Sequence, residues 1–151
     1  MKLFLVHHAE AVGHEVDTRR PLSPRGEEQA ALGAREAAAR GARPAVVWHS
    51  GKLRARQTAL AFWKACNALA EFAATPDLQP DDPPHRILNR LKGESRDMLL
   101  AGHYPHLPRL LSLLVTGRGD AGGVDFPQHG VVALETEDGG ETWRELWRLE
   151  V

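Results

Sequence analysis

Short apolar runs alternate along this chain with longer amphipathic segments. Runs with few polar interruptions are typical of strands that are buried on both faces of a sheet. They predict strands at residues 2–6, 45–48, 72–78, 97–102, 130–135 and 143–151. The last of these alternates less cleanly and is expected at an edge of the sheet.

The segments between the runs carry helix signals. Helices are predicted at residues 24–40, 52–70, 83–91 and 107–114. Ser23 is a suitable N-cap for the first helix, Pro24 suits its first position, and Gly41 suits its end. The second helix has apolar residues at i, i+3, i+4 and i+7, which give it one apolar face: Ala59, Phe62, Trp63 and Cys66.

This alternation predicts an α/β fold of three layers, with a mainly parallel sheet between two layers of helices. The length of 151 residues suits one domain, and we expect it to span residues 1–151. Residues 116–126 carry no regular pattern and are expected to form a loop.

Composition narrows the classes of partner. The formal net charge is −1, which argues against general nucleic-acid binding. Cys66 is the single cysteine, so no intrachain disulfide is possible, and we expect a reducing, cytoplasmic location. No apolar run is long enough to span a membrane, and no secretory leader is recognisable, so no membrane partner is expected.

Polar residues whose side chains are suited to catalysis or anion binding follow three of the predicted strands. His7 and His8 follow the first strand, Arg54 follows the second, and His103 follows the strand at 97–102. Ligands of open α/β sheets gather at the carboxyl ends of the strands, where helix N-termini also favour anions. The sequence therefore predicts an anion site at this edge.

The segments LVHHAEA, RPLSPRG, SGKLRARQTA and LLAGHYP together resemble the histidine phosphatase superfamily, which has the phosphoglycerate-mutase-like fold. The short chain, without a large insertion, is most similar to the small SixA-type phosphohistidine phosphatases. The resemblance implies that His8 is the nucleophile and that Arg54 and His103 hold the phosphoryl group. It places Arg20 near the pocket, and it places His7 where the family has an arginine.

The implied chemistry needs no metal and no cofactor. A neutral imidazole attacks phosphorus, and water then hydrolyses the phosphohistidine intermediate. A rival metal site would use His7, His8, His49 and His103. Zinc sites favour spacings such as His-Glu-x-x-His, which this chain lacks.

The expected partner is a phosphorylated protein or a small phosphate compound, and phosphohistidine on a protein is favoured. Its imidazole leaves with less help from an acid than an alkoxide needs. The family's larger members supply a glutamate from an insertion for which this chain has no room. Asp81 and Asp82 are candidates for a helper acid, although we expect them to cap the next helix.

His7 leaves three accounts open. It is protonated when phosphate binds, or Arg19, Arg20 or Arg25 moves into its place, or the site binds phosphorylated ligands without turning them over. Losing one donor costs on the order of 10²–10³ in rate. The retention of His8, Arg54 and His103 favours an active phosphatase over a weak or inactive phosphate-binding module of the same fold.

Overall fold

A six-stranded sheet forms the centre of the computed structural model, which describes residues 1–119 and 124–151. Its strands are β1 (Lys2–His7), β2 (Val46–His49), β3 (Glu71–Ala74), β4 (Met98–Gly102), β5 (Val131–Glu135) and β6 (Arg144–Leu149). Their order is β3-β2-β4-β1-β5-β6. The first four are parallel, whereas β5 runs antiparallel to β1 and β6 antiparallel to β5.

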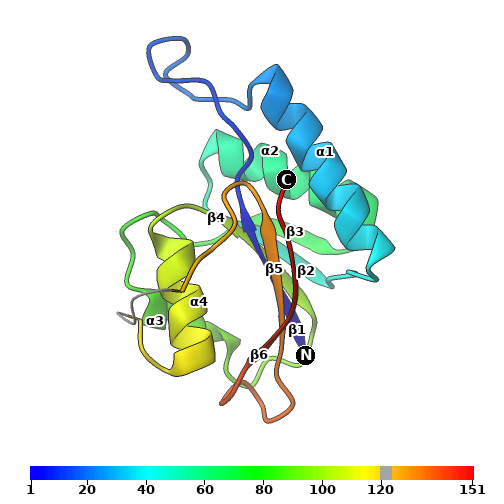
Figure 1. Ribbon diagram of the computed structural model, residues 1–151, viewed down its shortest axis with the longest axis vertical. Helices are drawn as coiled ribbons and strands as arrows, with labels where there is room; N and C mark the ends of the chain where they lie inside the picture. Colours follow the sequence, from blue (N-terminus) through cyan, green and yellow to red (C-terminus); the bar gives the residue numbers. More distant parts are fainter. Residues whose placement is uncertain (120–123) are drawn as a thin grey trace.

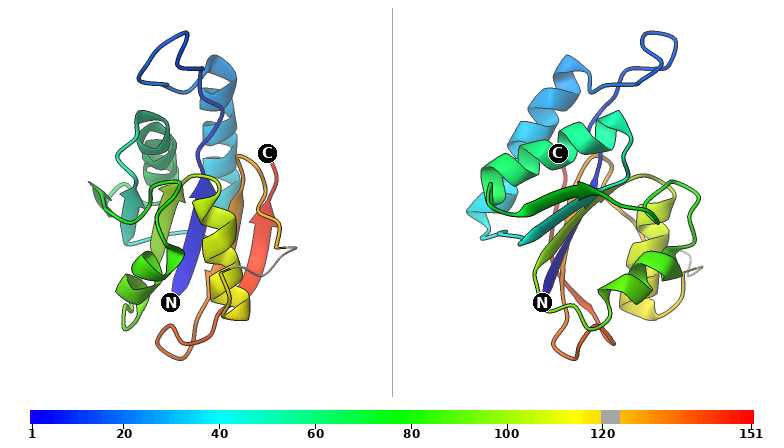
Figure 2. Two further views of the ribbon diagram at one scale, coloured as in Figure 1. Left: turned by 90° about the vertical axis from the view of Figure 1, so that its left-hand side faces the viewer. Right: turned by 180° about the vertical axis from the view of Figure 1, so that it is seen from behind.

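Two pairs of helices cover the sheet, one pair on each face (Figures 1 and 2). The helices are α1 (Pro24–Ala39), α2 (Leu53–Cys66), α3 (Pro84–Leu91) and α4 (His106–Thr116). Alternate residues of β1 point to opposite faces. Leu3 and Leu5 pack in the core beneath α3 and α4, while Phe4 and Val6 pack beneath α1 and α2. The predicted three-layer α/β fold with a mostly parallel sheet is confirmed.

The ends of two predicted elements differ from expectation. The second helix ends at Cys66, four residues early, because Asn67 leaves the helical conformation and its side chain binds the carbonyl of Pro44. The strand expected at residues 72–78 lies at 71–74. It forms one edge of the sheet, and β6 forms the other, as predicted. Of the loop expected at 116–126, residues 120–123 lie outside the described residues.

The start of α1 is fixed as the sequence predicts. The Ser23 hydroxyl accepts the backbone N–H of Gly26 at 3.0 Å, and Pro24 is the first helical residue. Gly41 follows the helix with a φ of 86°, a conformation that favours glycine. The Ser23 hydroxyl also donates to the Glu10 carboxylate at 3.0 Å, so the cap ties α1 to the loop after β1.

The register of the central strands sets up the site. His7 is level with Gly102 of β4, and His49 of β2 is level with Ala101. The carboxyl ends of β1, β2 and β4 therefore meet at one edge, from which the loop after β1 rises in Figure 1. Within the described residues, no helix has the length and apolar character needed to cross a membrane.

Candidate functional site

His8 lies at the centre of the candidate site. Its Nδ1 is 2.7 Å from the carbonyl oxygen of Ala9. A carbonyl only accepts, so Nδ1 carries the proton and Nε2 keeps its lone pair. Burial, helped by the positive charges of Arg54 and Arg20 and opposed by the Ala9 hydrogen bond, lowers the pKa of His8 to about 4. The ring is therefore neutral near pH 7, with a lone pair available on Nε2.

Two guanidinium groups lie close to this ring. Arg54 is in the first turn of α2, and its Nε is buried without a hydrogen-bond partner in residues 1–119 and 124–151. Arg20 has a φ of 50°, and its Nε donates to the carbonyl of Val12 at 3.0 Å. Burial and the charge of Arg20 lower the pKa of Arg54. A buried donor without a partner beside a second cation is suited to an oxyanion.

His103 flanks His8 on the β4 side. The centres of the two rings are 5.1 Å apart, and Nε2 of His103 is 2.6 Å from the hydroxyl of Ser50. The ring is 2% exposed. Burial, together with the neighbouring His8 and Arg54, lowers the pKa of His103 to about 3. His103 is thus neutral near pH 7, whereas a cationic ring would have added charge to the site.

His7 is buried within a stack of three rings. Its ring is parallel to that of Tyr104, with centres 4.2 Å apart, and to that of His129, with centres 5.0 Å apart. Its Nδ1 accepts the backbone N–H of His129 at 2.8 Å, so a neutral ring carries its proton on Nε2. Burial, with His8 nearby, lowers the pKa of His7 to about 2. These contacts argue against the account in which His7 is protonated.

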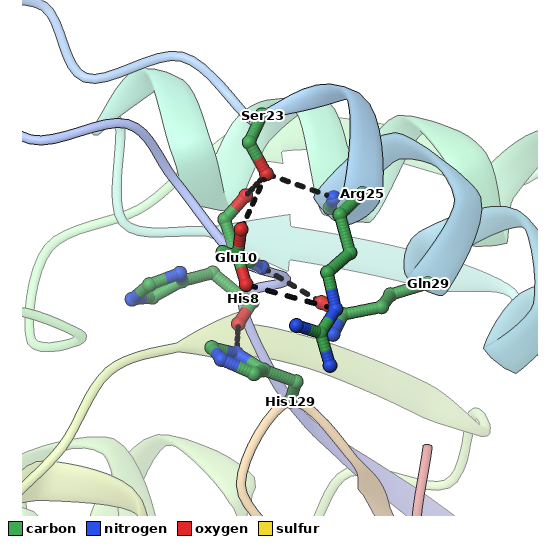
Figure 3. A network of polar contacts seen from close by, with 7 residues as sticks. His8, Glu10, Ser23, Arg25, Gln29 and His129 are labelled. Atoms are coloured by element: carbon green, nitrogen blue, oxygen red, sulfur yellow. Dashed lines mark hydrogen bonds and ion pairs between the residues drawn. The ribbon is translucent and has the colours of Figure 1, made fainter. Parts of the chain in front are cut away.

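His129 is the main addition that the structure makes to the predicted site. It has a φ of 57°, and its Nδ1 lies 2.7 Å from the carbonyl oxygen of His8 (Figure 3). It precedes β5, which pairs with β1, and this pairing brings it to the histidines. No short-range pattern in the sequence links it to His7, 122 positions earlier.

Two carboxylates, those of Glu10 and Asp82, bind groups outside the cluster of histidines. Glu10 accepts a hydrogen bond from the Ser23 hydroxyl, and its carboxylate faces Arg25 (Figure 3), at a distance of 3.9 Å. Asp82 accepts the backbone N–H of Gln79 at 2.9 Å, and no side chain among the described residues caps the N-terminus of α3. The expectation that Asp82 caps this helix is therefore wrong, because its carboxylate closes the preceding turn instead.

The histidines do not form the metal set considered from the sequence. Nδ1 of His49 accepts the backbone N–H of Gly51 at 3.0 Å, and its ring lies against Phe72. Ring nitrogens of His7, His8 and His129 lie within 4.8 Å of one another. The free nitrogen of neutral His7 carries a proton and has no lone pair for a metal. With two guanidinium groups nearby, these donors fit an oxyanion better than a cation.

Comparison with known proteins finds one matching family. Residues 3–79, about half of the chain, match the family model of the histidine phosphatase superfamily (branch 1). No curated protein matches the chain.

Solved structures share the fold over nearly the whole chain. The protein histidine phosphatase SixA in complex with tungstate has a TM-score of 0.84 at 21% identity, with 99% of this chain and 97% of that chain covered. A proposed phosphohistidine phosphatase SixA from Agrobacterium tumefaciens has 0.80 at 24%, with the same coverage. Phosphoglycerate mutase from Plasmodium falciparum has 0.71 at 15%, with 97% and 88% covered.

Proposed function

Because this chain belongs to the histidine phosphatase superfamily, we propose that it is a phosphohydrolase that works through a phosphohistidine on His8. The observation that carries the proposal is the state of His8. Its Nδ1–H is bound to the Ala9 carbonyl, its Nε2 is free, and the positive charges of Arg54 and Arg20 act on the ring. We take residues 1–151 as one catalytic domain.

The reaction has two steps. In the first, the lone pair on Nε2 of His8 attacks phosphorus, and the bond to the leaving group breaks. In the second, water attacks the phosphorus and the electron pair of the P–N bond returns to Nε2. Arg54 and Arg20 stabilise charge on the phosphoryl oxygens, and His103 adds a neutral donor or acceptor held by Ser50. We assign neither a metal nor a cofactor to these steps.

The favoured substrate is phosphohistidine on a protein. An alkoxide leaving group requires a strong acid. Of the two candidates for a helper acid, Asp82 accepts the backbone N–H of Gln79, and Asp81 is exposed. An imidazole leaving group needs less assistance. Fold similarity to the protein histidine phosphatase SixA is consistent with this class of substrate.

A second candidate function rests on His7. A site with a neutral ring in place of an arginine has one charge fewer for the transition state, and a module that only binds phosphorylated proteins would tolerate that loss. Turnover separates this module from the phosphatase.

The test is a single-turnover assay with a phosphohistidine-bearing protein and an aryl phosphate. Wild type is expected to accumulate acid-labile phosphate and then release it, whereas His8→Ala forms no phosphoenzyme. His85→Ala, on the exposed surface of α3, is the matched control. Wild-type turnover by folded His8→Ala would refute the nucleophile. Binding without release by wild type would identify the phosphate-binding module.

A further inference from the structure

One position of the proposed phosphoryl clamp lacks a positive charge. The resemblance to the family places an arginine where this chain has His7, and the structure holds His7 as a buried, neutral ring. A neutral N–H binds a phosphoryl oxygen more weakly than a charged one, and a single imidazole does not offer the two parallel donors of a guanidinium.

The arginines considered as substitutes are committed to other contacts. The Arg19 guanidinium is 3.0 Å from the Asp17 carboxylate on an exposed loop. Arg25 is mostly exposed and lies 3.9 Å from the Glu10 carboxylate. Arg20 already contributes its charge beside His8. The resemblance to the family places this arginine near the pocket in addition to the one that His7 replaces, so Arg20 does not compensate for the missing arginine.

His129 lies where a substitute is needed. Its backbone N–H binds Nδ1 of His7, its Nδ1 binds the carbonyl of His8, and its ring is stacked on His7 with an angle of 3° between the planes. With both Nδ1 atoms engaged by the backbone, the nitrogens left for a ligand are Nε2 of each ring. In Figure 3 the rings of His8 and His129 extend to the same side.

We propose that His7 and His129 together replace the missing arginine, with His129 supplying the positive charge. Two stacked rings present two N–H donors, Nε2–H of neutral His7 and Nε2–H of protonated His129, to the phosphoryl group at His8. One ring nitrogen from each of the three histidines lies within 4.8 Å of the other two, a spacing that two oxygens of one phosphoryl group can bridge. This inference rests on the proposed function.

The proposal predicts a clamp whose charge depends on pH, unlike a clamp built on arginine. A bound dianion favours the protonated form of His129. The charged and titratable groups around His129 are His7 of β1, His8 and Glu10 after it, Arg25 of α1 and Glu150 after β6. Beyond His7 lies Tyr104, whose pKa is raised by burial. His7 and His8 stay neutral near pH 7, so these two rings add no charge to the clamp in that range.

The experiment measures the Kd of tungstate, a tetrahedral dianion across neutral and mildly alkaline pH, from about pH 6.5 to about 8.5. The variant is His129→Asn, because asparagine tolerates a positive φ and the backbone N–H to His7 remains. His85→Asn, exposed on α3, is the matched control. For wild type and the control, the Kd is expected to be about tenfold lower at the acidic end of the range. His129→Asn is expected to bind weakly throughout, without this dependence.

The outcomes separate this inference from the proposed function. If wild type and His129→Asn bind tungstate with equal affinity at every pH, the inference is wrong while the phosphatase proposal stands. If His129→Asn binds normally and loses turnover only with poor leaving groups, His129 is a proton donor, and its place in the clamp is refuted. If wild type binds no tungstate at all, both proposals fail.

Discussion

At the scale of single residues, the backbone determines what each histidine can do. The Ala9 carbonyl leaves Nε2 of His8 with a lone pair, whereas the N–H of His129 leaves Nε2 of His7 with a proton. Adjacent residues of one type thus acquire opposite roles, an attacking atom and a donor. Residue type and spacing alone do not specify this difference, because both bonds come from main-chain groups.

The pKa of His8 gives a direct test at this scale. Burial lowers it to about 4, so the neutral, reactive ring should persist as pH falls until about pH 4, well below the ordinary value of 6.5. An NMR titration of the imidazole protons should place the midpoint of His8 near 4. After correction for the substrate's own ionisation near pH 6, the rate of phosphoenzyme formation should fall at low pH with the same midpoint. A His8 midpoint near 6.5 would contradict the buried environment described here.

At the scale of elements, the loop after β1 is held in place by the first turn of α1. The N-cap Ser23 binds Glu10, and Gly26 lies against the backbone of the same residue. A Cβ on Gly26 would lie 1.9 Å from the carbonyl oxygen of Glu10. Because Glu10 is two residues from His8, the packing of α1 also positions the proposed nucleophile.

Two glycines of α1 therefore respond differently to alanine. Gly26→Ala is expected to force the Glu10 backbone away, to lower the melting temperature and to lower the rate of phosphoenzyme formation at least tenfold, since small displacements of reacting groups are costly. Gly33→Ala is the matched control. Its Cβ would meet Phe62 at 3.4 Å, an ordinary contact, and it should gain up to about 1 kcal/mol of helix stability. Equal effects of the two substitutions on phosphoenzyme formation would contradict this role of α1.

The elements also show how far sequence reasoning reaches. Buried runs and the signals at Ser23 and Pro24 were sufficient for β1, β4 and α1, because these depend on local pattern and on burial on both faces. They failed at the end of α2, where the tertiary contact from Asn67 to Pro44 ends the helix. His129 was missed as a partner of His7 for the same reason, since it arrives through the pairing of β5 with β1.

At the scale of the whole molecule, the sheet buries several ionisable rings at its functional edge. In the folded protein the pKa values of His7, His8 and His103 are about 2, 4 and 3, against an ordinary value of 6.5. The unfolded chain therefore binds more protons than the folded chain below about pH 6.5. The stability that these neutral rings provide is fully present above that pH and is lost as the pH falls toward the folded values.

This linkage sets a window in which the histidines dominate. Between about pH 6.5 and 5.5, carboxyl groups with ordinary pKa values of 3.8 to 4.5 remain mostly ionised, including the unfolded forms of Glu94 and Asp138. The free energy of unfolding should fall across this window by up to about 1.4 kcal/mol per pH unit for each of the three buried histidines. Urea unfolding at several pH values in an anion-free buffer measures this slope.

His7→Gln isolates one contribution to that slope. Glutamine retains an acceptor for the backbone N–H of His129 but does not titrate. The slope of the unfolding free energy against pH should therefore decrease by the contribution of one proton, up to about 1.4 kcal/mol per pH unit. The exposed His85→Gln should leave the slope unchanged. A slope identical in wild type and His7→Gln would mean that His7 binds a proton in the folded state as readily as in the unfolded chain. That result would remove the neutral donor from the clamp, and the positive charge would then have to be assigned to His7 itself.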